Sequence, residues 1–87
     1  MLQVIYTTEY ARSYKRLSPQ LKIEVKEKVE QFRDPRNHER LRLHKLHGDM
    51  KAYHSFSVNY SVRVIVRIVN KKAIAFIIDV GDHSIYE

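Results

Sequence analysis

The sequence contains no cysteine, only two glycines and no long hydrophobic run. Without cysteine the chain can form neither a disulfide nor a thiolate zinc site, which fits a reducing compartment. Two glycines are too few for a glycine-rich loop that cradles a phosphate. The apolar stretch at residues 1–6 is far too short for a signal peptide or a membrane span. We therefore expect no membrane association and a location in the cytoplasm.

Acidic residues are scarce relative to basic ones. The chain of 87 residues has 10 Asp and Glu against 16 Lys and Arg, and its formal net charge is +6. An excess this large on so small a chain indicates a polyanionic partner, either nucleic acid or an acidic protein segment. The hydrophobic content of 44% suffices for one core. Residues 1–87 are therefore expected to form a single domain.

The last third of the chain predicts three consecutive strands, at residues 51–58, 61–69 and 72–80. Short polar joints between them favour antiparallel hairpins. In the middle strand, alternation places Val64 and Val66 on one face and Arg63 and Arg67 on the other. We therefore expect a sheet with one apolar face and one basic face.

Strict alternation makes two further assignments in these strands. It puts Ile77 and Val80 in opposite rows of the last strand. In the first strand it puts His54 in the same row as Phe56, which is the more apolar row and would bury the histidine. A β-bulge would be needed to turn His54 to the basic face.

The first third of the chain predicts a strand at residues 2–6 and then two helices. Thr7 or Thr8 can cap the first helix, and Ser18 with Pro19 begins the second. Asp34-Pro35 ends the second helix. The expected fold is α+β with the order β-α-α-β-β-β, in which a helical hairpin packs on a mainly antiparallel four-stranded sheet.

Three residues of the first helix, Tyr10, Tyr14 and Leu17, fall at helical spacing and form one stripe. We interpret this stripe as core packing rather than as a platform for stacking bases.

Four of the five histidines lie between residues 33 and 54, and this stretch is rich in arginine and lysine. His44 and His47 are three residues apart, but no carboxylate or cysteine spacing completes a recognisable metal site. We therefore expect neither a metal nor another cofactor.

Imidazoles, guanidinium groups and aromatic rings are together suited to cleaving RNA. The reaction needs a base for the 2′-hydroxyl, a cation for the phosphorane and an acid for the leaving oxygen. Residues of these types are His44, His54, Arg63, His83 and Tyr86. A solvated outer face of the sheet accounts for Arg63 and Arg67 equally well.

Several short motifs, in this order and spacing, resemble the RelE/ParE superfamily of bacterial toxins from type II toxin–antitoxin modules. They are the Leu-His-Lys-Leu-His-Gly run at residues 43–48, Tyr53, Ser-Val-Arg-Val-Ile at 61–65, Asp-Val-Gly-Asp-His at 79–83, and Tyr86. The likeness is greatest to the YafQ-like and RelE-like branches.

The resemblance implies a RelE-like fold and a metal-independent endoribonuclease that cuts mRNA on the ribosome and so inhibits translation. It also implies a cognate antitoxin as a partner, besides the ribosome and mRNA. By position, the implied catalytic residues are His44, Arg63, His83 and Tyr86. We expect substrate binding by Lys45, Lys51, His54 and Arg67.

The sequence departs from the family pattern at several positions. Phe56 stands where RelE has a second lysine, and Asp79 stands where YafQ-like toxins have an arginine. Two alternatives therefore stay open. One is a ParE-like inhibitor of DNA gyrase, and the other is a catalytically weak member that mainly binds its antitoxin.

Overall fold

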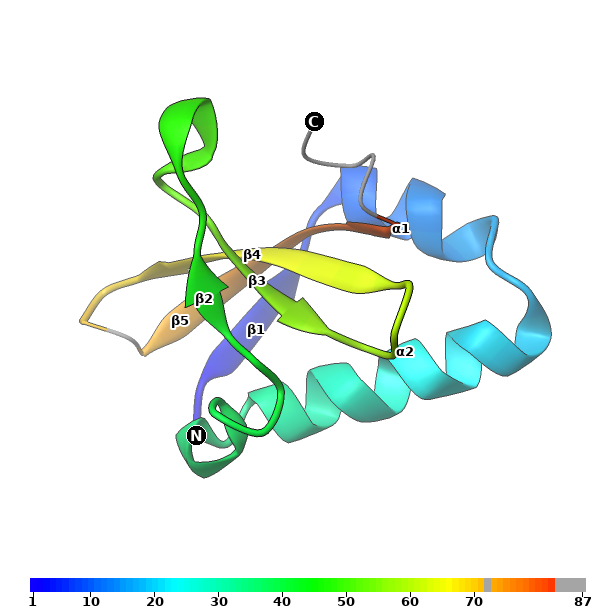
Figure 1. Ribbon diagram of the computed structural model, residues 1–87, viewed down its shortest axis with the longest axis horizontal. Coiled ribbons are helices and arrows are strands. Elements are labelled where there is room, and N and C mark those ends of the chain that lie inside the picture. The colour runs from blue at the N-terminus through cyan, green and yellow to red at the C-terminus, as the bar shows by residue number, and fades with distance from the viewer. Residues whose placement is uncertain (72, 83–87) are drawn as a thin grey trace.

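The computed structural model describes residues 1–71 and 73–82, in which two helices pack on a five-stranded sheet (Figure 1). The helices and strands are β1 (Gln3–Tyr6), α1 (Thr8–Lys15), α2 (Pro19–Phe32), β2 (His44–Lys45), β3 (His54–Ser57), β4 (Arg63–Val69) and β5 (Ile74–Gly81). Short 3-10 turns at Pro35–Asn37 and Gly48–Met50 flank β2. No helix in the described part of the chain is both long and apolar enough to cross a membrane.

Both helices begin where the sequence predicts. The Thr7 hydroxyl accepts a hydrogen bond from the Tyr10 amide at 3.1 Å, and Ser18 does the same for the Leu21 amide at 3.2 Å. These bonds satisfy amide groups that the first turn of a helix cannot pair internally. Helix α2 ends at Phe32, just before the Asp34-Pro35 pair.

The strand order is β1-β5-β4-β3-β2, with β1 parallel to β5 and every other pair antiparallel. The predicted class and element order are confirmed, and the sheet has one strand more than expected. That strand is β2, in which His44 pairs with Ser55 and Lys45 pairs with His54. Two polar residues carry no alternation, so no sequence pattern marks them as a strand.

Each of the three predicted C-terminal strands starts later than expected, because a turn takes up its first residues. The Tyr53 amide donates to the Met50 carbonyl, which delays β3. The Asn59 side chain accepts from the amides of Ser61 and Val62 and so delays β4. Before β5, Asn70 and Lys71 form a turn with left-handed φ values of 53° and 54°.

A β-bulge in β5 changes which side chains reach the core. Ile65 pairs with Asp79 and Val66 pairs with Ile77, so Ile78 has no partner on β4. The extra residue shifts the alternation by one position. As a result Ile77 and Val80 both belong to the core, and their predicted placement in opposite rows is wrong.

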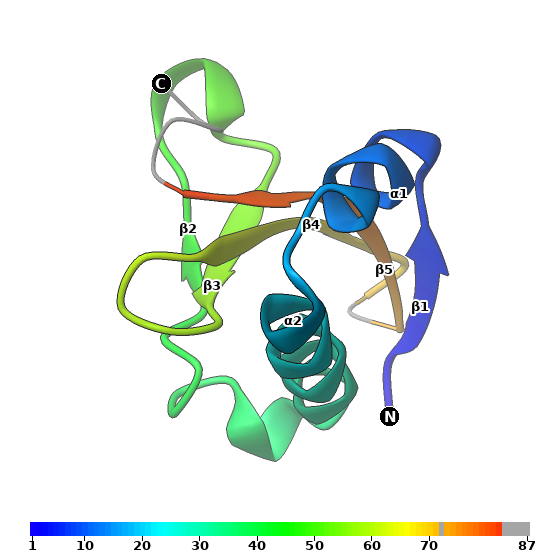
Figure 2. The ribbon, with the colours of Figure 1, turned by 90° about the vertical axis from the view of Figure 1, so that its right-hand side faces the viewer.

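The core lies between the helices and the face of the sheet that carries Val64 and Val66. Helix α2 lies beneath the strands in Figure 2 and contributes Val25, Val29 and Phe32. The Phe32 ring stacks on the Phe56 ring, with centroids 4.8 Å apart.

Helix α1 packs its predicted stripe against the same core. Tyr10 is buried, and Tyr14 and Leu17 pack on the buried cluster, so the interpretation as core packing is confirmed. The Tyr10 ring also contacts Tyr6 and Tyr14, with centroids 5.4 and 5.7 Å apart.

Candidate functional site on the open face of the sheet

The face of the sheet opposite the helices brings His44 and Arg63 together. Paired residues of neighbouring strands point to the same side, and His44, Ser55, Ile65 and Asp79 form one continuous line of pairs. Arg63 lies on the same face as this line, because residues two apart in a strand share a side. We call this surface the open face.

Strand geometry gives the separation between these two residues. Neighbouring strands lie about 4.8 Å apart and each residue advances about 3.3 Å, so two steps in each direction give roughly 12 Å between the Cα atoms of His44 and Arg63. Both side chains are long enough to reach inward from such positions. Ser55 and Ile65, which lie between them on this face, are 0% and 1% exposed.

The ring of His44 is held in a defined orientation. This exposed side chain has Nδ1 2.9 Å from the carbonyl oxygen of Arg42. A carbonyl can only accept a hydrogen bond, so Nδ1 carries the proton and donates it. In the neutral ring, Nε2 is then the nitrogen with the free lone pair, which is the state that a general base requires.

The carbonyl of Arg42 reaches the ring because the preceding loop folds back on itself. Arg42 has a left-handed φ of 59°. Its amide donates to the Glu39 carbonyl at 3.0 Å, and the Leu43 amide donates to the His38 carbonyl at 3.0 Å. These two bonds close the loop directly before β2.

Arg63 is half-buried at the start of β4, and its Nη1 donates to the Ser57 hydroxyl at 2.6 Å. Ser57 is also its partner in the β3–β4 register. The bond holds the guanidinium group at the end of the side chain, which carries a positive charge. A guanidinium held in this way can present two parallel donors to phosphate oxygens.

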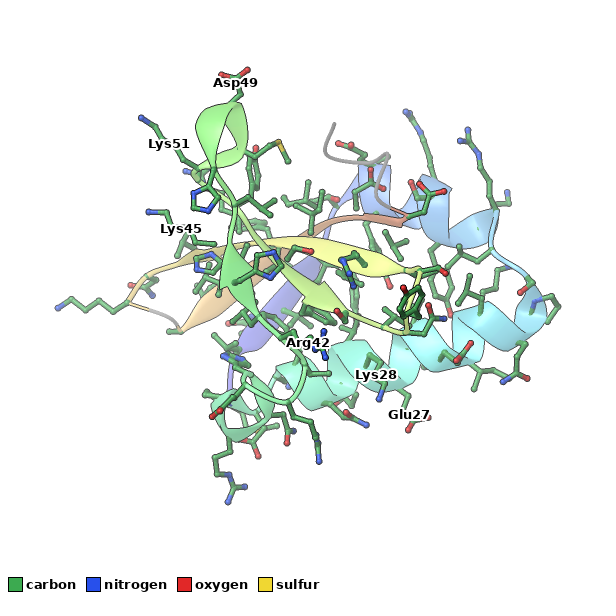
Figure 3. The ribbon with its side chains drawn as sticks, viewed as in Figure 1. Glu27, Lys28, Arg42, Lys45, Asp49 and Lys51 are labelled. Carbon is green, nitrogen blue, oxygen red and sulfur yellow. The ribbon has the colours of Figure 1, made fainter. Side chains whose placement is uncertain are left out.

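The predicted substrate-binding residues divide between the two faces. Arg67 is exposed on the open face, in the row of Arg63. His54 pairs with Val66 and so lies on the helix-covered side, as strict alternation predicts. Lys45 shares the side of His54, and Lys51 follows the Gly48–Met50 turn. Both lysines are exposed (Figure 3). Lys45 projects from β2, and Lys51 projects from the segment between β2 and β3.

Two of the predicted catalytic residues, His83 and Tyr86, lie outside the described residues. Among the described residues, Gly81 at the end of β5 pairs with Arg63. Among residues 1–71 and 73–82, no three histidine or carboxylate side chains come together in a way that could hold a metal ion.

A groove of about 990 Å³ opens next to Arg63, between α2 and the β3–β4 turn. Its cationic lining residues are Lys28, Arg40, Arg42 and Arg63. Sequence reasoning noted the basic character of the stretch that contains Arg40 and Arg42, but it did not single out Lys28. Only the packing of α2 under the sheet brings Lys28 to the same groove.

No protein-family model matches this sequence, and no curated protein matches it by sequence either. The fold does match solved structures over nearly its whole length. The toxin–antitoxin complex RelBE2 from Mycobacterium tuberculosis contains a chain with a TM-score of 0.77 and 21% identity, in a match that covers 95% of this chain and 92% of that one. The chain has the RelE-like toxin fold.

Two other structures with the RelE-like fold agree. In the DinJ–YafQ toxin–antitoxin complex from E. coli, the match has a TM-score of 0.76 and 16% identity and covers 98% of this chain and 96% of that one. In the archaeal RelE–RelB complex from Pyrococcus horikoshii, the TM-score is 0.72, the identity is 15%, and 93% of each chain is covered.

Within the RelE-like fold, the two departures noted in the sequence have structural roles here. Phe56 is 0% exposed and stacks on Phe32, so its position belongs to the core. Asp79 accepts a hydrogen bond of 2.5 Å from the Ser13 hydroxyl, which ties α1 to β5. Both residues stabilise the fold rather than contributing a cation.

Proposed function

We propose that this protein is the toxin of a type II toxin–antitoxin module and cleaves mRNA on the ribosome without a metal ion. The observation that supports the proposal is that His44, in whose neutral ring Nε2 holds the free lone pair, lies on the same open face as Arg63. The RelE-like fold and the basic surface support it.

In the proposed reaction, Nε2 of His44 takes the proton from a ribose 2′-hydroxyl, and the oxygen attacks the adjacent phosphorus. Arg63 stabilises the charge on the pentavalent phosphorane. The bond from phosphorus to the 5′-oxygen breaks, and His83 supplies the proton that this oxygen takes. The products are a 2′,3′-cyclic phosphate and a 5′-hydroxyl. Tyr86 stacks on a base next to the scissile bond.

The partners follow from the same proposal. A cognate antitoxin with an acidic or amphipathic segment neutralises the basic surface, and the toxin acts in the cytoplasm, where translating ribosomes are found. An antitoxin gene should lie next to the toxin gene. Co-expression of its product should restore growth.

The test is regulated expression in bacteria, with growth followed and mRNA ends mapped by primer extension. The parent should arrest growth and produce new mRNA ends within translated regions. His44→Ala should lower the cleavage rate by about 10²–10⁴-fold, as expected for loss of a general base. Arg63→Lys keeps the charge but loses the bidentate geometry, and it should also lower the rate.

His47→Ala is the matched control, because it removes an exposed imidazole three residues from His44. It should leave cleavage unchanged. If His44→Ala and Arg63→Lys both cleave mRNA like the parent, the proposed mechanism is wrong. Growth arrest with intact mRNA and an induced DNA-damage response would instead indicate a gyrase inhibitor.

A further inference from the structure

We propose that the groove between α2 and the β3–β4 turn binds the phosphate backbone of a single-stranded RNA segment that continues from the open face. The choice of RNA as the ligand rests on the proposed function. The groove shares Arg63 with the open face, but its binding of RNA can be tested without any cleavage.

The first support is the convergence of cations from three separate parts of the chain. Lys28 comes from α2, Arg40 and Arg42 come from the loop before β2, and Arg63 comes from β4. Figure 3 shows Lys28 and Arg42 below β3 on the same side of the molecule. Asp82 is the single carboxylate among the described lining residues, so the formal charge of these residues is 4 − 1 = +3.

The second support is that three of these cations form no ion pair within the described part of the chain. The ion pairs among the described residues join Arg33 to Glu30 and Arg36 to Asp34, so Lys28, Arg40 and Arg42 form none with a described carboxylate. Within residues 1–71 and 73–82, the Arg40 side chain donates to the neutral Asn37 side chain, at 2.8 Å. Positive charge held in a hollow attracts a polyanion more strongly than the same charge spread over a flat surface.

The third support is Tyr60, which stands at the groove with 96% of its surface exposed. An exposed aromatic ring beside cations is the pairing that proteins use to hold single-stranded nucleic acid, because bases stack on the ring while phosphates contact the cations. The apolar lining residues Leu41 and Val58 are 3% and 5% exposed. These two aliphatic side chains therefore add little to the groove surface, and its cations and the exposed ring of Tyr60 favour RNA over a protein segment.

The groove is also continuous with the proposed catalytic face. Arg63 belongs to both, and the carbonyl of Arg42 is the hydrogen-bond partner of His44. A strand cut between His44 and Arg63 would reach the groove within a few nucleotides. The groove would then set the direction in which the strand leaves the site.

The test uses a 2′-O-methyl oligoribonucleotide of about twelve nucleotides, within the span of known single-strand sites, which cannot be cleaved because it has no free 2′-hydroxyl. Affinity is measured by fluorescence anisotropy over a range of salt concentrations. The double variant Lys28→Gln/Arg40→Gln should bind more weakly. The slope of log K against log [salt] should become shallower by about 0.7 for each phosphate that the variant no longer neutralises.

The control variant Lys22→Gln/Lys26→Gln also removes two positive charges, both from α2 and both outside the groove. It should keep most of the slope and affinity of the parent. Tyr60→Ala should weaken binding by about tenfold at every salt concentration, and Tyr60→Phe should retain affinity, because stacking depends on the ring.

The outcomes separate this proposal from the proposed function. If the groove variant binds the probe as tightly as the control variant does, the groove proposal is wrong, whether or not the parent cleaves mRNA. If the groove variant loses affinity while the parent cleaves nothing, the groove proposal stands and the nuclease proposal fails. If a polyglutamate peptide binds the parent through Lys28 and Arg40 while the RNA probe does not bind, the ligand is an acidic protein segment and the RNA assignment is overturned.

Discussion

The ring of His44 and the backbone of Arg42 are joined by one hydrogen bond, in which Nδ1 lies 2.9 Å from the carbonyl oxygen. This bond couples a candidate base to a loop whose shape depends on a left-handed residue. The tautomer of the imidazole is therefore set by the backbone and not by another side chain. The tautomer of the His44 ring and the effect of the Arg42 conformation on stability can be measured separately.

The tautomer of His44 can be observed by NMR. In a long-range ¹H–¹⁵N spectrum of the neutral ring, we expect the proton on Nδ1 and the lone pair on Nε2, because the Arg42 carbonyl can only accept. His47 is the internal comparison, since its ring has no hydrogen bond to a described residue. A His44 ring that carries its proton on Nε2 would remove the basis for its role as the base.

The left-handed conformation of Arg42 predicts that a glycine variant at this position is more stable than an alanine variant. In this conformation, a residue with a Cβ atom lowers the free energy of unfolding by about 1–2 kcal/mol, whereas glycine does not. Arg42→Gly should therefore be more stable than Arg42→Ala by about 1 kcal/mol in urea unfolding. In the interior of α2 the order should reverse, with Lys26→Ala more stable than Lys26→Gly by about 1 kcal/mol. If the alanine variant were the more stable one at both positions, the left-handed conformation of Arg42 would be wrong.

The stacked pair Phe32–Phe56 predicts a large effect of truncation. Phe56→Ala should lower the free energy of unfolding by about 3–5 kcal/mol, out of a typical total of about 5–15 kcal/mol. Phe56→Lys, which restores the residue type found in RelE, should unfold the protein because it buries an unpaired charge. Tyr60→Ala, on a ring that is 96% exposed, should change stability by less than about 0.5 kcal/mol. Thermal and urea unfolding followed by circular dichroism measure all three.

The raised pKa of Tyr10 predicts that the protein loses stability at alkaline pH. Burial raises the pKa of the Tyr10 phenol well above its ordinary value of 10.0, and the neighbouring Tyr6 and Tyr14 add to the rise. The folded state therefore keeps a proton that the unfolded state loses. This contribution is fully present below pH 10 and disappears as the pH rises above it, by up to about 1.4 kcal/mol per pH unit.

Tyr10→Phe should remove this dependence while keeping the packing, because the Tyr10 hydroxyl forms no hydrogen bond with a described residue. Its stability should fall less steeply than that of the parent between pH 9 and pH 11, in urea unfolding at fixed ionic strength. Tyr60→Phe, a change on the surface, should keep the profile of the parent. Parallel curves for Tyr10→Phe and the parent would show that Tyr10 does not titrate differently on unfolding.

Local signals in the sequence were enough to predict the helices and the two faces of β4. Thr7, Ser18 and Pro19 act within one helical turn, so their effect does not depend on the rest of the fold. The alternation of Arg63 with Val64 likewise shows directly which residues of β4 share a side. For the same reason, the shared face of Arg63 and Arg67 was predicted correctly.

The features that sequence reasoning missed all depend on contacts between distant residues. The bulge at Ile78 appears only when β5 is set against β4, and β2 exists only because β3 pairs with it. Lys28 was missed because its position in the groove depends on how α2 packs under the sheet. Propensity and periodicity carry no information on such long-range placement.

The parallel pairing of β1 with β5 joins two distant segments of the chain, since Gln3 is the register partner of Ile74, a separation of 74 − 3 = 71 residues. During synthesis, the first strand has no partner until β5 has been made. A pairing this distant in sequence closes slowly, because the entropy of the long intervening loop must be overcome first. A nascent chain that stops short of β5 therefore cannot assemble the finished sheet.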